Sequence, residues 1–175
     1  MRYILALMMT VVLALPARAE VEITEVVSPG GITAWLVQEP SIPFTAMELR
    51  FRGGASLDAP GKRGATNLMT GLLEEGAGDL DARGFARALE GLAASFGYDV
   101  GDDSLAVSAR FLTENRDQAV DLLRASLLEP TFAPDAVERV RQQVLTGIAS
   151  DDKDPDELAS REFDKLAYGD HPYAT

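Results

Sequence analysis

The chain has 175 residues, of which 46% are hydrophobic and 25% charged, and this composition is typical of a globular domain with its own core. Its 28 Asp and Glu outnumber its 16 Lys and Arg, so binding to nucleic acid or to an anionic membrane would be electrostatically repulsive. The chain contains no cysteine, which excludes a disulfide framework and leaves the core to provide the stability.

Residues 1–19 have the pattern of a cleavable secretory signal peptide. The basic Arg2 is followed by an apolar run, Ile4 to Leu15, which is too short to cross a bilayer comfortably, and then by a small-x-small cleavage site at residues 17–19. We therefore expect a periplasmic mature domain over residues 20–175, with no membrane anchor. Loss of two arginines with the signal peptide leaves 14 Lys and Arg against 28 Asp and Glu, a net charge near −14.

The first elements of the mature chain are predicted to be two strands, at 31–40 and 42–56, followed by a helix over 64–78 with the sequence GATNLMTGLLEEGAG. The apolar spacing in this helix predicts a core-facing stripe made of Ala65, Leu68, Met69, Leu72, Leu73 and Gly76. The opposite face carries Asn67, Thr70, Gly71 and Glu74. Three of these four are small or mediocre helix formers, which is unusual for a solvated helix face.

The remaining pattern predicts another amphipathic helix, an antiparallel strand pair and three closing helices. The amphipathic helix, over 80–97, has Phe85, Leu89, Leu92 and Phe96 facing inward. The strands, 96–103 and 104–112, meet at a turn over Gly101–Asp103.

The closing helices are expected at 113–130, 133–151 and 154–169. The second begins with Pro134 and turns Val137, Val140, Val144 and Ile148 inward, and the third is capped by Asp154. Paired strands with helices between and after them predict an α+β fold, an antiparallel sheet with helices packed on one side.

The residues themselves give little sign of catalysis. The single histidine, His171, and the lack of cysteine fall short of a zinc ligand set, and His171 is expected in a surface turn. The acidic run from Ser150 to Glu157 lacks the spacing of a calcium loop, and a helix cap within a solvated connector explains it better. The chain also has no nucleophile elbow and no phosphate-binding glycine motif. Taken alone, these observations indicate a non-catalytic chain.

Four stretches, read in order, resemble the N-terminal domain of the insulinase/pitrilysin zinc metallopeptidases, which include the mitochondrial processing peptidases. The resemblance covers residues 33–173 and rests on RGGASLDAPGKRGATNLMTGLLEEGAG, FARALEGLAASFGYDVGDDSLAVSARFL, AVDLLRASLLEPTFAPDAVERVRQQVLTGI and LAYGDHPY. No single fragment is diagnostic, but the order and spacing of all four are specific. The resemblance implies a metallopeptidase-like half-domain, incomplete at its C-terminus, over residues 20–175.

In that family the opening helix carries the zinc motif His-x-x-Glu-His, in which both histidines bind zinc and the glutamate activates water. A glutamate from a later helix is the third ligand. By this resemblance the four positions fall on Asn67, Thr70, Gly71 and Gly147, which we call the vacated positions. None of the zinc or base residues is carried over, so the resemblance implies no catalytic residue, no metal ligand and no zinc in this chain.

Some bacterial members of the family resemble heterodimers of one subunit with the zinc motif and one without it. The resemblance therefore implies a zinc-free, non-catalytic subunit that helps to form a chamber for peptide substrates with an active, zinc-bearing paralogue. An alternative is a stand-alone peptide-binding or scaffolding protein that kept the peptidase fold, for which the acidic charge would favour basic peptides. A third possibility is a truncated product without independent function. By resemblance the chain belongs to a metalloendopeptidase family, but we expect it not to be catalytic alone.

Overall fold

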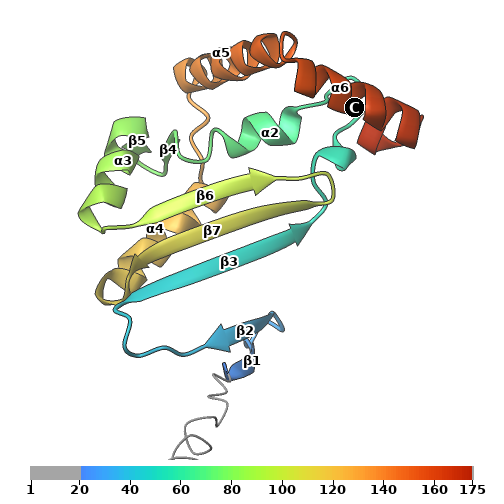
Figure 1. Cartoon of the computed structure of the whole chain (residues 1–175). Helices are drawn as coiled ribbons and strands as arrows, with labels where there is room; N and C mark the ends of the chain where they lie inside the picture. The colour runs from blue at the N-terminus through green and yellow to red at the C-terminus, as the bar shows by residue number, and fades with distance from the viewer. Residues whose placement is uncertain (1–20, 175) are drawn as a thin grey trace, which may run out of the picture. The chain divides into compact units, whose positions relative to one another are not determined.

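The computed structural model describes residues 21–174, so the predicted signal peptide lies outside the described residues (Figure 1). The chain forms two compact units, which divide after Ile42. The first is an antiparallel hairpin of β1 (Ile23–Val27) and β2 (Thr33–Val37). The strand predicted at 31–40 corresponds to β2, whereas β1 was not predicted.

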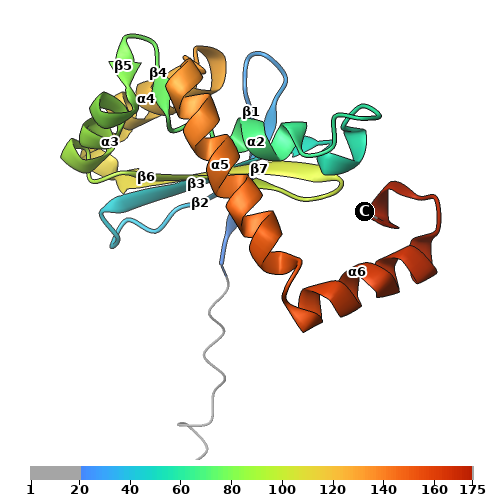
Figure 2. The same cartoon turned by 90° about the horizontal axis from the view of Figure 1, so that it is seen from above.

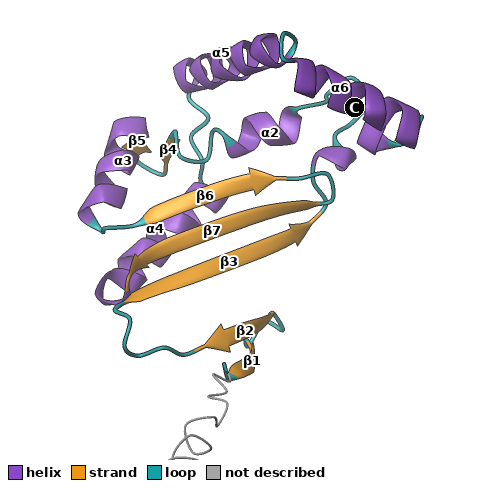
Figure 3. Cartoon of the chain, viewed as in Figure 1, coloured by secondary structure: helices purple, strands orange, loops and turns teal. Residues whose placement is uncertain are grey.

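The second unit is built on a three-stranded antiparallel sheet of order β3-β7-β6 (Figure 3). Its strands are β3 (Phe44–Arg52), β6 (Ser95–Val100) and β7 (Ser104–Leu112). Alternation along the central strand β7 buries Val107, Ala109 and Phe111 on one face. Helix α4 (Arg116–Leu128) covers that face with Ala119 and Leu123. The predicted α+β fold with an antiparallel sheet is confirmed.

Helix α3 (Ala82–Gly91) follows the small hairpin of β4 (Gly76–Ala77) and β5 (Leu80–Asp81). Asp81 caps it by accepting a hydrogen bond from the Gly84 amide at 2.7 Å, and Phe85 is fully buried. The prediction that this helix extends to residue 97 was wrong. Ala93 has a φ of +48°, which stops the helix, and Phe96 lies in β6 instead.

Helix α2 (Ala65–Thr70) is much shorter than the helix predicted over 64–78. The chain leaves it through turns and enters β4 at Gly76, whose φ is +128° and where a β-carbon would lie 2.7 Å from the Leu80 carbonyl oxygen. The predicted division into two faces was also wrong at Thr70, which is buried. Leu72 and Leu73 are buried as expected, although they lie beyond the helix.

Helices α5 (Pro134–Asp151) and α6 (Pro155–Tyr168) follow, and both agree closely with prediction (Figure 2). Asp154 caps α6 by accepting a hydrogen bond from the Asp156 amide at 2.9 Å, as predicted. The expectation for Ile148 was wrong, because this residue is 47% exposed. Only the first part of α5 is buried, through Ala136 and Val140.

The predicted turn at Gly101–Asp103 is confirmed, and the loop at residues 53–56 is hydrogen-bonded to it. The Gly53 amide donates to the Asp103 carbonyl at 2.7 Å, and the Ser56 hydroxyl donates to the Asp102 carbonyl at 2.6 Å. Short 3-10 turns at Ala55–Leu57, Thr113–Asn115 and Pro172–Ala174 (η1, η2 and η3) complete the unit. Within residues 21–174, no helix combines the length and the apolar character needed to cross a membrane.

Candidate functional site

The vacated positions lie on α2, just after it, and on α5, and α2 is fixed at its start by one carboxylate. Asp58 accepts hydrogen bonds from the Gly64 amide at 2.8 Å, the Thr66 amide at 3.1 Å and the Thr66 hydroxyl at 2.6 Å. The Thr66 hydroxyl is the main reason why the pKa of Asp58 is lowered. Asp58 thus satisfies amide groups that the first turn of a helix leaves without partners.

Apolar packing joins α2 to α5. Leu72, just beyond α2, forms a buried cluster with Ala136 and Val140 of α5, and Leu68 and Val144 pack against it. An ion pair between Glu75 and Arg139 adds a polar tie between the same two regions. The two segments that carry the vacated positions are therefore neighbours.

Asn67 and Thr70 occupy the first two vacated positions and differ in their exposure. Asn67 is exposed, whereas Thr70 is only 6% exposed. The Thr70 hydroxyl donates to the Asn67 carbonyl oxygen at 2.8 Å, within the same helix. This hydrogen bond satisfies the hydroxyl inside the protein.

The two vacated glycine positions have opposite surroundings. A β-carbon at Gly71 would lie 3.0 Å from Val140 Cγ1, which is closer than ordinary van der Waals contact. A β-carbon at Gly147 would have no other atom within 4 Å. Val140 therefore occupies the space next to Gly71, whereas the surface around Gly147 is open.

A partly buried polar pair lies on the neighbouring elements β6 and α4. The hydroxyls of Tyr98 and Ser126 are 2.6 Å apart, and Ser126 also donates to the Leu123 carbonyl at 2.8 Å. Burial, with a smaller contribution from the charge of Glu74, raises the pKa of Tyr98 to about 12. We did not predict this pair. The signal available in the sequence was a serine at a core-facing position of α4, between Leu122 and Leu123 on one side and Leu127 on the other.

The pKa of Glu74, beside the vacated positions, is raised. Protein atoms displace part of the water around its carboxylate, and the charge of Glu75 adds a smaller effect. A cleft of about 700 Å³ opens nearby, lined among others by Glu75, Asp79, Arg83 and Arg139, but by none of the vacated positions. Among residues 21–174, no group of three or more His, Asp or Glu side chains is placed to hold a metal ion. His171 is exposed in a turn, as predicted, with its ring 4.5 Å from that of Tyr173.

The family assignment follows from a match over most of the chain. The family model for insulinase (peptidase family M16) matches residues 34–175. The chain belongs to peptidase family M16. The sheet, α2 and its contact with α5 all lie within the residues that match this family.

Two relatives of this M16 chain illustrate the range of names in the family. It is 33% identical over 133 residues to a protein of Helicobacter pylori called non-peptidase homolog YmxG, a match that covers 76% of this chain and 31% of the relative. It is 23% identical over 142 residues to an uncharacterized zinc protease of Rickettsia felis, covering 81% of this chain and 34% of that protein. The chain thus spans about a third of the length of these relatives.

Solved structures share the fold of this M16 chain. The peptidase M16 inactive domain from Pseudomonas fluorescens superposes with a TM-score of 0.80 and 32% identity, covering 87% of this chain and 37% of that one. A protease from Helicobacter pylori superposes with a TM-score of 0.76 at 17% identity, covering 89% of this chain and 38% of that one, which shows a common fold.

Proposed function

We propose that this M16 chain is a zinc-free, non-catalytic subunit that forms a chamber for peptide substrates together with an active, zinc-bearing paralogue. The observation that carries this proposal is that none of the vacated positions offers a zinc ligand and that Val140 crowds one of them. Val140 stands 3.0 Å from where a β-carbon of residue 71 would lie, and the Thr70 hydroxyl is bonded to its own helix. A side chain at position 71 would press against the buried Val140, which would have to shift by a few tenths of an ångström.

The comparisons support the same proposal. Two similar proteins bear names that describe a non-peptidase homolog and an inactive domain, and both share about a third of their residues with this chain over the matched region. The four vacated positions hold an amide, a hydroxyl and two glycines, none of which supplies the nitrogen and carboxylate ligands that zinc prefers. The retained α2–α5 packing then serves to shape a wall rather than to hold a metal.

Peptidase assays on the purified chain, its zinc-motif paralogue and their mixture test the proposal. We expect hydrolysis by the mixture, none by this chain alone, and a reduced rate for the paralogue alone. A matched control replaces the motif glutamate of the paralogue by glutamine, which should abolish activity of the mixture. Full activity of the paralogue alone, or stoichiometric zinc in this chain, would contradict the proposal.

Periplasmic location is part of the proposal and rests on the pattern of residues 1–19. We expect the exported protein to begin at Glu20. Fractionation of the source cells, followed by N-terminal sequencing, measures this directly. Recovery of the chain from the cytoplasm with Met1 retained would overturn this part alone.

A stand-alone peptide-binding role is the second candidate, favoured by one observation. In the second unit, β3 and β6 are the outer strands of the sheet, so each offers backbone groups along one edge. An extended peptide adds to such an edge by main-chain hydrogen bonds. Binding of a labelled basic peptide to this chain without any paralogue, and an unchanged paralogue activity in the mixture, would favour this role over the first.

A further inference from the structure

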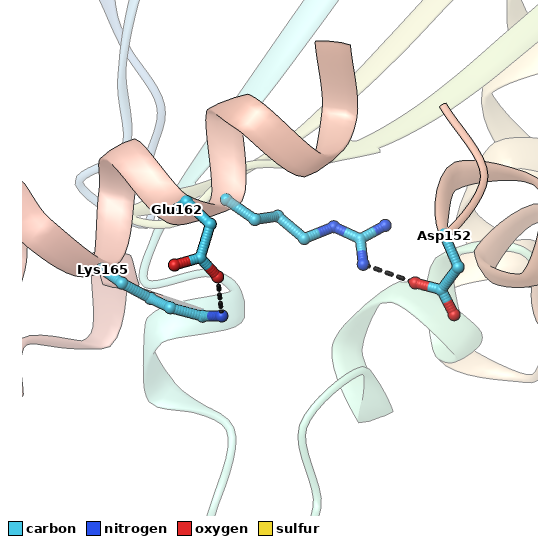
Figure 4. Close-up of polar contacts among 4 residues, drawn as sticks. Asp152, Glu162 and Lys165 are labelled. Atoms are coloured by element: carbon cyan, nitrogen blue, oxygen red, sulfur yellow. Dashed lines mark hydrogen bonds and ion pairs between the residues drawn. The ribbon is translucent and has the colours of Figure 1, made fainter. Parts of the chain in front are cut away.

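We draw no further inference here: the strongest candidate, the exposed apolar face at Phe163 and Leu166 of helix α6, the helix whose ion pairs Arg161–Asp152 and Lys165–Glu162 are drawn in Figure 4, carries no proposal because nothing in the structure shows what covers it.

Discussion

Gly71 and Gly147 both lack a side chain, but the surroundings of the two positions differ. Gly71 is exposed but has Val140 packed beside it, whereas Gly147 lies on the exposed half of α5 with open space around it. At the residue scale, a side chain at 71 therefore requires Val140 to move by a few tenths of an ångström, whereas a side chain at 147 requires no movement.

Alanine substitution at the two glycines should shift stability in opposite directions. Gly147→Ala should stabilise the protein by about 0.5–1 kcal/mol, because alanine favours the helix and meets no neighbour. Gly71→Ala should destabilise it by about 1 kcal/mol, because the new methyl group crowds Val140. Urea unfolding of both variants measures the difference, and equal shifts of the same sign would contradict the packing described at Gly71.

Tyr98 should make stability depend on pH in the alkaline range. Its pKa is about 12 in the folded protein, against about 10 for an ordinary tyrosine. The unfolded chain therefore loses this proton first, so the contribution of Tyr98 is complete below pH 10 and is lost as the pH rises toward 12. Tyr98→Phe should flatten that decline, as measured by urea unfolding between pH 9 and 11.5. Tyr168→Phe, at an exposed tyrosine, is the control and should leave the decline unchanged.

At the scale of elements, α2 shows how a helix of six residues is maintained. Isolated helices of this length are not stable in water, so the supporting contacts decide its existence. Asp58 holds its start, and the cluster around Leu72 holds its end. The vacated positions remain in a defined place because of these contacts and not because of helix propensity.

Removal of the Asp58 carboxylate should loosen α2. Asp58→Ala eliminates three hydrogen bonds and should cost about 1–2 kcal/mol, with faster amide exchange at Gly64 and Thr66. Because the folded-state pKa of Asp58 is lowered, its contribution is present above the ordinary pKa of aspartate and is lost as the pH falls through the lowered value. The variant should therefore lose less stability on acidification than the wild type. Asp170→Ala, at an exposed turn, serves as the matched control.

Most elements could be predicted from the sequence where one periodicity ran unbroken, as in β7, α4, α5 and α6. The errors arose where a backbone break interrupted an apolar pattern. The helical spacing that includes Phe96 passes through Ala93, whose positive φ ends α3, and the spacing from Ala65 to Gly76 passes from a helix into a strand. Apolar spacing alone does not distinguish a continuing helix from a turn that buries the same residues.

The surroundings of the predicted positions could not be derived from the sequence. The resemblance placed Asn67, Thr70, Gly71 and Gly147 on adjacent segments. The burial of Thr70 and the contact between Gly71 and Val140 depend on how two helices separated by some 70 residues of sequence meet. Such contacts are set by tertiary packing, which local patterns do not encode.

At the scale of the whole molecule, the excess of negative charge acts on stability through long-range repulsion. A net charge of −12 destabilises a compact state, and the exposed ion pairs recover little, since each is worth about 0–1 kcal/mol. The solubility of the chain benefits from the same charge. The balance between lower stability and higher solubility depends on the ionic strength of the surroundings.

Salt should therefore stabilise this protein. Between about 10 mM and about 150 mM NaCl the screening length falls from about 30 Å to about 8 Å, which weakens repulsion across the molecule. We expect a rise in the melting midpoint, followed by circular dichroism at 222 nm. The same change of salt near pH 4.4, where the chain carries no net charge, should have much less effect. A falling midpoint at pH 7 would show that local ion pairs outweigh the repulsion.

The turn at Gly101–Asp103 has a consequence for the timing of folding during synthesis. The loop at Gly53–Ser56 hydrogen-bonds to this turn, and β3 pairs with β7 just beyond it. Synthesis proceeds at about 5–20 residues per second, so β3 and its loop wait for several seconds before their partners are made. Throughout that interval the nine-residue strand β3 is unpaired and can pair with strands of other polypeptide chains. The unpaired β3 strand is therefore open to misassociation until β7 has been synthesised.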